Sequence, residues 1–131
     1  MLKAIRNLDY VVLLCEDVDA MTRFYNDTLG FPIYRAWEGW VEMRAGATLL
    51  TLRKRGRPYD GPSAPGSAGV QLAFRVAPGE VDACHAELLA KGANIVQEPH
   101  SYRYGDNDEY GHRTIFFKDP EGNILEIYAD L

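Results

Sequence analysis

The chain closes on the segment Thr114-Ile115-Phe116-Phe117-Lys118-Asp119-Pro120-Glu121-Gly122-Asn123-Ile124-Leu125-Glu126-Ile127-Tyr128. β-Branched and aromatic residues dominate its two ends, which predicts two strands. The residues between them favour a tight turn, because Pro120 presets φ at the corner and Gly122 can adopt a positive φ. The side chains of Asp119 and Asn123 can bond nearby backbone amides. We therefore expect a β-hairpin at this end of the chain.

Glu126 interrupts the apolar pattern of the second strand, where it stands between Leu125 and Ile127. Its carboxylate faces either solvent or a polar pocket. In a partly apolar pocket the charge would be costly without a partner, so we expect a raised pKa or an ion pair. Arg53 and Arg113 are the candidate partners. The alternative is a solvent-facing or salt-bridged glutamate with no functional role.

Composition excludes several classes of protein. The net charge of −5 argues against nucleic acid as the main partner, and we interpret the basic run from Arg53 to Arg57 as a solvated strand end and loop. No apolar run approaches the length of a membrane span, and no signal peptide is evident. Cys15 and Cys84 lack a CxxC or Cys-His context, which favours reduced thiols. We therefore expect a cytoplasmic protein that binds neither nucleic acid nor membrane.

The first part of the chain predicts one helix and four strands. A β-prone run from Leu8 to Cys15 precedes a helix that Asp17 or Asp19 caps and that runs to about Thr28. Gly30 suits the left-handed position that ends such a helix. Short strands are expected at 33–36, 40–44 and 48–53.

The second part predicts the same order of elements. We expect a strand at 70–76, a helix at 78–91, a short strand at 95–97, a long tyrosine-rich loop at 99–111 and then the terminal hairpin. Residues 56–68 are dense in Gly, Pro and Ser and predict a linker. The chain is thus interpreted as a single domain, 1–131, with module one at 1–55, the linker at 56–68 and module two at 69–131.

The spacing of corresponding positions supports an internal repeat. Tyr10 corresponds to Gln71 at an offset of 61 residues, and Thr51 corresponds to Glu126 at an offset of 75. The larger offset accommodates the extra loop of the second half. The predicted fold is therefore α+β, with two β-α-β-β-β modules forming an open curved sheet or barrel around a concave pocket.

Two motifs carry a resemblance to a known family. They are Phe24-Tyr25-x-x-x-Leu29-Gly30-Phe31 and Phe117-x-Asp119-Pro120-x-Gly122-Asn123-x-x-Glu126. With the repeat, they make the chain similar to the vicinal oxygen chelate superfamily, which includes glyoxalase I, bleomycin-resistance and fosfomycin-resistance proteins and extradiol dioxygenases. The resemblance implies paired modules in open barrels and a homodimer. Whether the dimer exchanges modules or pairs intact chains stays open.

The resemblance also implies where a metal would bind. Metal-dependent members take ligands from four equivalent strand positions, which here hold Tyr10, Thr51, Gln71 and Glu126. A catalytic site usually needs about three suitable protein ligands, and this set offers one carboxylate, one amide and no imidazole. We therefore expect no metal cofactor, with a divalent metal as the alternative. A replacement metal site built from loop histidines is less favoured than pocket-lining or solvated histidines.

Strand alternation indicates which side chains face the cavity. Aromatic residues near its walls favour a flat or hydrophobic ligand that carries a polar group. We expect a small-molecule binding protein in which Glu126 holds a cationic group or acts as a general base, and whether the protein is an enzyme stays open. The alternatives are a metal-dependent or Glu-based lyase, isomerase or dioxygenase, and a purely structural module. The candidate ligand-binding residues are Tyr10, Trp37, Trp40, Thr51, Arg53, Gln71, His100, Tyr102, Tyr104, His112, Arg113 and Glu126, of which Glu126 is also the candidate catalytic residue.

Overall fold

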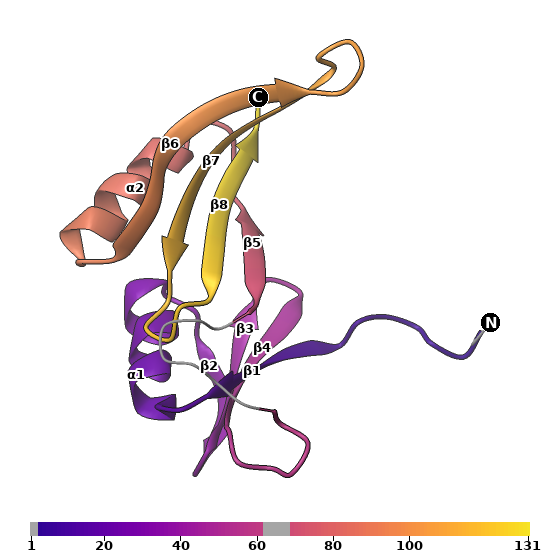
Figure 1. The fold of residues 1–131 in the computed structure, drawn as a ribbon, viewed down its shortest axis with the longest axis vertical. Helices are drawn as coiled ribbons and strands as arrows, with labels where there is room; N and C mark the ends of the chain where they lie inside the picture. The colour runs from indigo at the N-terminus through magenta and orange to yellow at the C-terminus, as the bar shows by residue number, and fades with distance from the viewer. Residues whose placement is uncertain (1–2, 62–68) are drawn as a thin grey trace. The chain divides into compact units, whose positions relative to one another are not determined.

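The computed structural model describes residues 3–61 and 69–131. The chain divides into two compact units, Met1–Pro62 and Ser63–Leu131 (Figure 1). The predicted linker therefore falls partly on described residues, 56–61, while 62–68 lie outside them. Within the described residues no helix is long and apolar enough to cross a membrane.

The first unit holds one helical segment and one four-stranded sheet. The helical segment starts at Val18 because the Asp17 carboxylate caps it, accepting a 3.0 Å hydrogen bond from the Ala20 amide. It ends before Gly30, whose φ of +80° is the left-handed conformation expected there. The elements are β1 (Tyr10–Cys15), α1 (Val18–Arg23), the π-helical turn η1 (Phe24–Thr28), β2 (Ile33–Trp37), β3 (Trp40–Ala45) and β4 (Thr48–Lys54).

The second unit repeats this order of elements. Its strands and helix are β5 (Gln71–Arg75), α2 (Val81–Ala90), β6 (Asn94–Tyr104), β7 (Tyr110–Lys118) and β8 (Ile124–Asp130). The sheet orders are β1-β4-β3-β2 and β5-β8-β7-β6, and in each sheet only the first pair is parallel. Both sheets are open. The predicted α+β fold of two β-α-β-β-β modules is therefore confirmed.

Strand register confirms the repeat residue by residue. In the parallel pair of the first unit Val12 lies opposite Thr51, and in the second unit Ala73 lies opposite Glu126. From the first unit to the second, Val12 and Ala73 are 61 residues apart, and Thr51 and Glu126 are 75 residues apart. These are the offsets that the sequence predicts. Thr51 and Glu126 therefore occupy equivalent positions in the two sheets.

The terminal hairpin forms as predicted, with Thr114 opposite Tyr128. Its turn is organised by Asp119, which is only 4% exposed. Asp119 Oδ1 accepts hydrogen bonds from the amides of Glu121 and Asn123 at 2.9 and 3.0 Å, and the Asn123 side-chain amide donates to Oδ2 at 2.7 Å. Gly122 has a φ of +94°, so a side chain at this position would be strained.

One sequence prediction about the second unit is wrong, and the predicted helix starts later than expected. The short strand at 95–97 and the loop at 99–111 are instead one eleven-residue strand, β6, and β7 begins at Tyr110. Two register shifts in the β6–β7 pair accommodate Gln97, Pro99 and their neighbours, and the two strands curve together towards their connecting loop (Figure 1). The helix expected at 78–91 begins only at Val81, because Pro78 and Gly79 form a turn.

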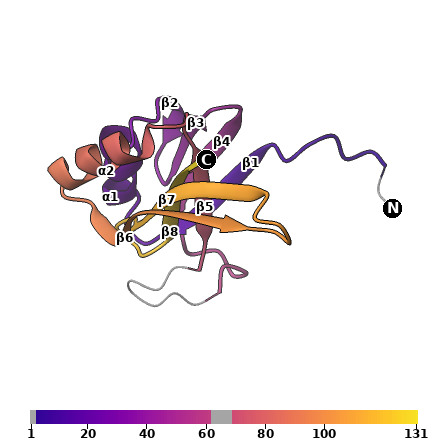
Figure 2. The ribbon, with the colours of Figure 1, turned by 90° about the horizontal axis from the view of Figure 1, so that it is seen from above.

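Each sheet has a helix on one face (Figures 1 and 2). In β8 the buried residues Leu125, Ile127 and Ala129 alternate with the half-buried Glu126 and Tyr128. The buried set packs on the α2 side, as strand geometry requires. The face that carries Glu126 is therefore turned away from the helix.

Candidate functional site

A hollow of about 410 Å³ lies on the face of the second sheet that is turned away from α2. This volume is within the usual range for small-molecule sites. Side chains from β5, β6, β7 and β8 surround it, and most of them are aromatic. The lining residues are Ala73, Tyr102, Tyr104, His112, Glu126 and Tyr128.

Strand alternation and register bring these side chains together. Tyr102 and Tyr104 are two residues apart on β6 and share a face, and Tyr102 lies opposite His112 on β7. On the other side, Ala73 of β5 lies opposite Glu126 and leaves space beside the carboxylate. The long β6, which the sequence did not predict, therefore places the tyrosines in the wall of the hollow.

His112 is the centre of the polar contacts in the hollow. Its Nδ1 lies 3.5 Å from the Tyr102 hydroxyl and its Nε2 lies 3.4 Å from the Tyr104 hydroxyl. Nε2 is also 3.2 Å from Asp130 Oδ1. Asp130 in turn forms an ion pair with Arg75, at 2.5 Å. The guanidinium of Arg75 also lies 4.8 Å from the centre of the Tyr128 ring. The rim of the hollow thus carries a connected set of charged and aromatic groups.

The Glu126 carboxylate is half-buried and hydrogen-bonded to a neutral group. The Thr114 hydroxyl donates to Glu126 Oε2 at 2.7 Å. Burial, and secondarily the charge of Glu126, raises the pKa of Tyr102. The two arginines that the sequence offered as partners are bound to other carboxylates, Arg53 to Asp60 and Arg113 to Asp82.

Arg113 points to the other face of the sheet. It forms two hydrogen bonds to the Asp82 carboxylate of α2, at 2.7 and 2.8 Å, and one to Ser101. This pairing holds the pKa of the Asp82 carboxyl below its usual range. Arg113 therefore ties α2 to the sheet and does not line the hollow.

Two further predicted residues of this unit lie beside the hollow and do not line it. His100 stacks on Tyr102 with ring centres 6.2 Å apart and is exposed. Gln71 is exposed at the start of β5, two residues before Ala73, and shares its face. Of the seven candidate residues in the second unit, the hollow thus collects Tyr102, Tyr104, His112 and Glu126.

The remaining candidates belong to the first unit, where the tryptophans form one cluster. Trp37 and Trp40 lie opposite each other at the β2–β3 turn and stack with ring centres 5.9 Å apart. Tyr10 approaches Trp40 edge-on at 6.5 Å. The Trp40 indole donates to Glu42, which also pairs with Arg35 at 2.7 Å. Arg35, followed by Trp40, lowers the pKa of the Glu42 carboxyl.

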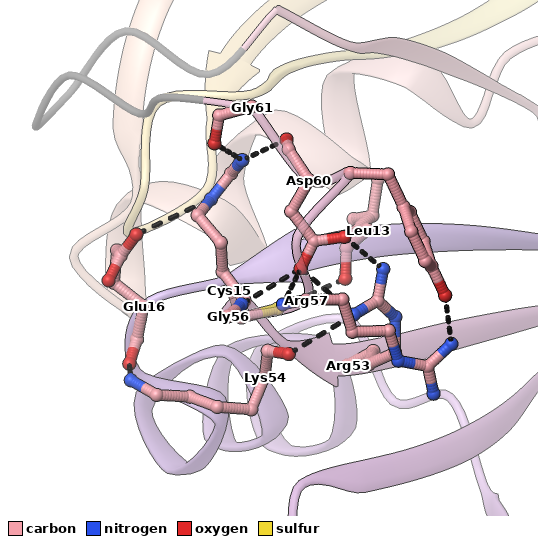
Figure 3. A network of polar contacts seen from close by, with 11 residues as sticks. Leu13, Cys15, Glu16, Arg53, Lys54, Gly56, Arg57, Asp60 and Gly61 are labelled. Atoms are coloured by element: carbon pink, nitrogen blue, oxygen red, sulfur yellow. Dashed lines mark hydrogen bonds and ion pairs between the residues drawn. The ribbon is translucent and has the colours of Figure 1, made fainter.

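Arg53 is buried and bound to Asp60, so the interpretation of residues 53–57 as a solvated strand end and loop is wrong for Arg53, whereas Lys54, Gly56 and Arg57 are exposed. The pair is bidentate, at 2.7 and 3.0 Å, and the Asp60 side chain is only 3% exposed. Asp60 also accepts hydrogen bonds from the amides of Gly56 and Arg57, both at 2.8 Å (Figure 3). Residues 56–61 are thus folded against β4, and Arg53 is engaged in holding them.

Comparison with known proteins gives the family. The family model of the Glyoxalase/Bleomycin resistance protein/Dioxygenase superfamily matches residues 7–127. The chain belongs to this superfamily.

Relatives and solved structures agree with this assignment. The chain is 29% identical to Virulence protein STM3117 of Salmonella typhimurium, over 94% of this chain and 83% of the relative. The crystal structure of that protein aligns with 97% of this chain and 98% of the crystallised chain. The sequence identity in this alignment is 25% and the TM-score is 0.74. A glyoxalase/bleomycin resistance protein/dioxygenase from Nocardioides shares the fold, with a TM-score of 0.78 and 23% identity over 99% of this chain and 87% of its own.

The donor set at the four strand positions fits the divalent metal of this superfamily poorly. Tyr10 and Thr51 offer hydroxyls, Gln71 offers an amide, and one oxygen of Glu126 already accepts a bond from Thr114. Within residues 3–61 and 69–131 no three or more His, Cys, Asp or Glu side chains are grouped as metal ligands. The buried Thr51 hydroxyl finds no hydrogen-bond partner among these residues. The four positions thus offer one carboxylate and no imidazole, fewer than the three or so protein ligands that such a metal site usually has.

Several residues of the site were outside the predicted set. Tyr128 follows from alternation with Glu126, and Thr114 follows from the hairpin register, so both could be derived from the sequence. Asp130 could not, because its role depends on which arginine or histidine its side chain reaches in space. The same holds in the first unit for Asp60 and Glu42, which lie outside the hollow.

Proposed function

We propose that this superfamily member binds a small organic molecule in the hollow of its second unit and does so without the usual divalent metal ion. The observation that carries the proposal is the lining itself. Three tyrosines, one histidine and one carboxylate converge on a space of about 410 Å³. Mostly apolar walls with a few placed polar groups are the usual make-up of a ligand site.

The aromatic lining supports a flat or hydrophobic ligand. Tyr102 and Tyr104 are inclined at 33° with ring centres 5.9 Å apart, and Tyr128 lies against His112 at 5.0 Å. These rings offer stacking surfaces at low cost in side-chain entropy, while their hydroxyls and Glu126 can fix a polar group.

The proposal of metal-free binding rests on donor chemistry. A single carboxylate and a neutral amide would hold a divalent ion weakly, and the Thr114 hydrogen bond competes for one carboxylate oxygen. Metal analysis of the purified protein, before and after incubation with Ni²⁺, Zn²⁺, Mn²⁺ or Fe²⁺, tests it. We expect substoichiometric metal in each case. A stoichiometric metal that Glu126→Gln removes would contradict metal-free binding.

The second candidate function is an enzyme that uses Glu126 as a general base. It is favoured by one observation: a half-buried carboxylate, oriented by Thr114, faces a ligand-sized space. Turnover that is lost in Glu126→Gln while ligand affinity is retained would support this function over binding alone.

A fragment screen tests the binding proposal. Thermal shift and amide chemical-shift mapping should identify aromatic fragments that perturb residues of β6, β7 and β8. Tyr104→Leu should weaken the binding of these fragments, because it removes a ring and a hydroxyl from the wall of the hollow. Tyr59→Phe is the control, since Tyr59 is exposed in the first unit. The proposal fails if no fragment perturbs the lining residues, or if both variants behave as wild type.

We also propose a cytoplasmic homodimer. Strand β2 is exposed along its length and is an edge strand, and Trp37 is 57% exposed. Apolar residues on a free edge favour association with another chain. The cytoplasmic part of the proposal is supported by the two cysteines, Cys15 and Cys84, which are present as thiols, the form that a reducing compartment maintains. Sedimentation at several concentrations tests the dimer: we expect twice the mass of 14.7 kDa, and a constant monomer mass would refute it.

A further inference from the structure

We propose that the ligand of the hollow carries a cationic nitrogen, an ammonium or guanidinium-like group, held between the Glu126 carboxylate and the tyrosine rings. This inference rests on the proposed binding function and specifies the chemical class of the ligand. Three sets of observations support it: the charge of the lining, the arrangement of the rings, and the engagement of nearby arginines.

The charge of the lining is the first. Among the six lining residues Glu126 contributes a negative charge and no arginine or lysine contributes a positive one. The hydrogen bond from Thr114 is from a neutral hydroxyl and leaves that charge uncompensated. His112, the remaining ionisable base, is directed to Asp130 and to the phenols of Tyr102 and Tyr104.

The nearby arginines cannot supply the missing charge without breaking other contacts. Arg75 pairs with Asp130 at the rim, at 2.5 Å. Arg113 is bound to Asp82 on the face that carries α2. A ligand that covers Glu126 without a positive charge of its own would remove water from an unpaired carboxylate, and this desolvation is costly. A cationic ligand avoids this cost, whereas an anionic ligand adds repulsion.

The rings are the second part of a cation site. Tyr102, Tyr104 and Tyr128 all line the same hollow, and the faces of aromatic rings attract cations. The chain itself provides an example, because the Arg75 guanidinium lies 4.8 Å from the Tyr128 ring centre. Aromatic cages are an established way of binding quaternary ammonium groups, and here Glu126 adds a negative charge to such a lining.

The test compares three benzyl probes on the wild-type protein: benzyltrimethylammonium, its uncharged isostere neopentylbenzene, and the smaller anion phenylacetate. Affinities come from amide chemical-shift titrations at low ionic strength. We expect the ammonium probe to bind about tenfold more tightly than neopentylbenzene, as one ion pair with cation–π contacts provides. Phenylacetate should bind most weakly. The largest shifts should fall on β6, β7 and β8.

Two variants with the same change of charge separate the site from the overall field of the protein. Glu126→Gln should reduce the affinity for benzyltrimethylammonium severalfold, towards that for neopentylbenzene, because the cation–π contacts of the tyrosines remain, and it should leave the affinity for neopentylbenzene unchanged. Glu87→Gln, on the exposed side of α2, should change neither. The wild-type comparison alone remains decisive if Glu126→Gln does not fold.

The outcomes distinguish this inference from the binding function on which it rests. Equal affinities for the ammonium probe and its neutral analogue, or equal losses in both variants, overturn the cation inference. Uncharged fragments that still bind the hollow would then leave the binding function standing. If neither the probes nor any fragment perturbs the lining residues, both are overturned.

Discussion

The Thr114 hydroxyl on β7 donates a 2.7 Å hydrogen bond to Glu126 Oε2 on β8. Thr114 is fully buried, so its hydroxyl fixes the position of the carboxylate from beneath the hollow. Thr114→Val keeps the shape of the side chain and removes this donor. We expect a loss of stability of about 1 kcal/mol and a severalfold loss of affinity for fragments that contact Glu126. Thr114→Ser should restore affinity, and chemical denaturation with fragment titration checks both. Unchanged affinity in Thr114→Val would show that the bond does not orient Glu126.

Asp119 should be the most sensitive position of the terminal hairpin. Its carboxylate accepts three hydrogen bonds within the turn and is almost wholly buried. Asp119→Ala leaves those amide donors without an acceptor, so we expect a loss of about 3 kcal/mol in the free energy of unfolding. Denaturant unfolding measures it. Asp106→Ala, in the exposed β6–β7 loop, should cost much less. Equal losses would contradict this role of Asp119.

The Arg53–Asp60 pair should make the first unit sensitive to acid. Arg53, and secondarily the amides of Gly56 and Arg57, hold the pKa of Asp60 well below its usual range. A lowered folded-state pKa stabilises above the unfolded value of about 4, and this stability is lost as the pH falls through the folded value. Asp60→Asn should be less stable at pH 7 and lose less on acidification below about pH 4.

Both tryptophans lie in the first unit, so their fluorescence during denaturation at each pH reports on this pair. Asp9→Asn, an exposed change in the same unit, should leave the acid profile as in the wild type. Parallel profiles for Asp60→Asn and the wild type would contradict the role assigned to the pair.

Tyr102 should ionise at a higher pH than an ordinary tyrosine side chain. Its pKa is raised from the ordinary value of 10.0 by burial and then by the charge of Glu126. The pKa of Tyr102 is higher in the folded state than in the unfolded state. The associated stability is therefore fully present below about pH 10 and is lost as the pH rises through the folded-state pKa. Tyrosinate absorbance, compared between the wild type and Tyr102→Phe, isolates this residue. Glu126→Gln should lower the pKa of Tyr102 part of the way towards the ordinary value. An unshifted titration would show that the two residues do not interact.

The sequence predicts the fold of this protein because its signals are local. Asp119, Gly122 and Asn123 specify a turn through their own backbone bonding, and Asp17 and Gly30 specify the ends of a helical segment in the same way. The repeat offsets then fix which strand positions correspond. Register followed correctly from these signals, so Thr51 and Glu126 could be matched before the strands were observed.

The extent of β6 could not be predicted, because its polar and tyrosine-rich residues lack a strand pattern. It forms by pairing with β7, and its side chains gain their partners only across that pairing. The two predicted arginine partners of Glu126 failed for a related reason. Arg53 and Arg113 each pair with another carboxylate, Asp60 and Asp82, and sequence separation does not reveal such pairings.

The alternation along β8 has an evolutionary consequence. Leu125, Ile127 and Ala129 hold the sheet to α2, whereas Glu126 and Tyr128 project from the other side of the same strand. Substitutions in the second set change the chemistry of the hollow and leave the core packing in place. One strand can therefore acquire a new ligand preference at little cost to folding, which suits a scaffold that serves a superfamily of resistance proteins, glyoxalases and dioxygenases.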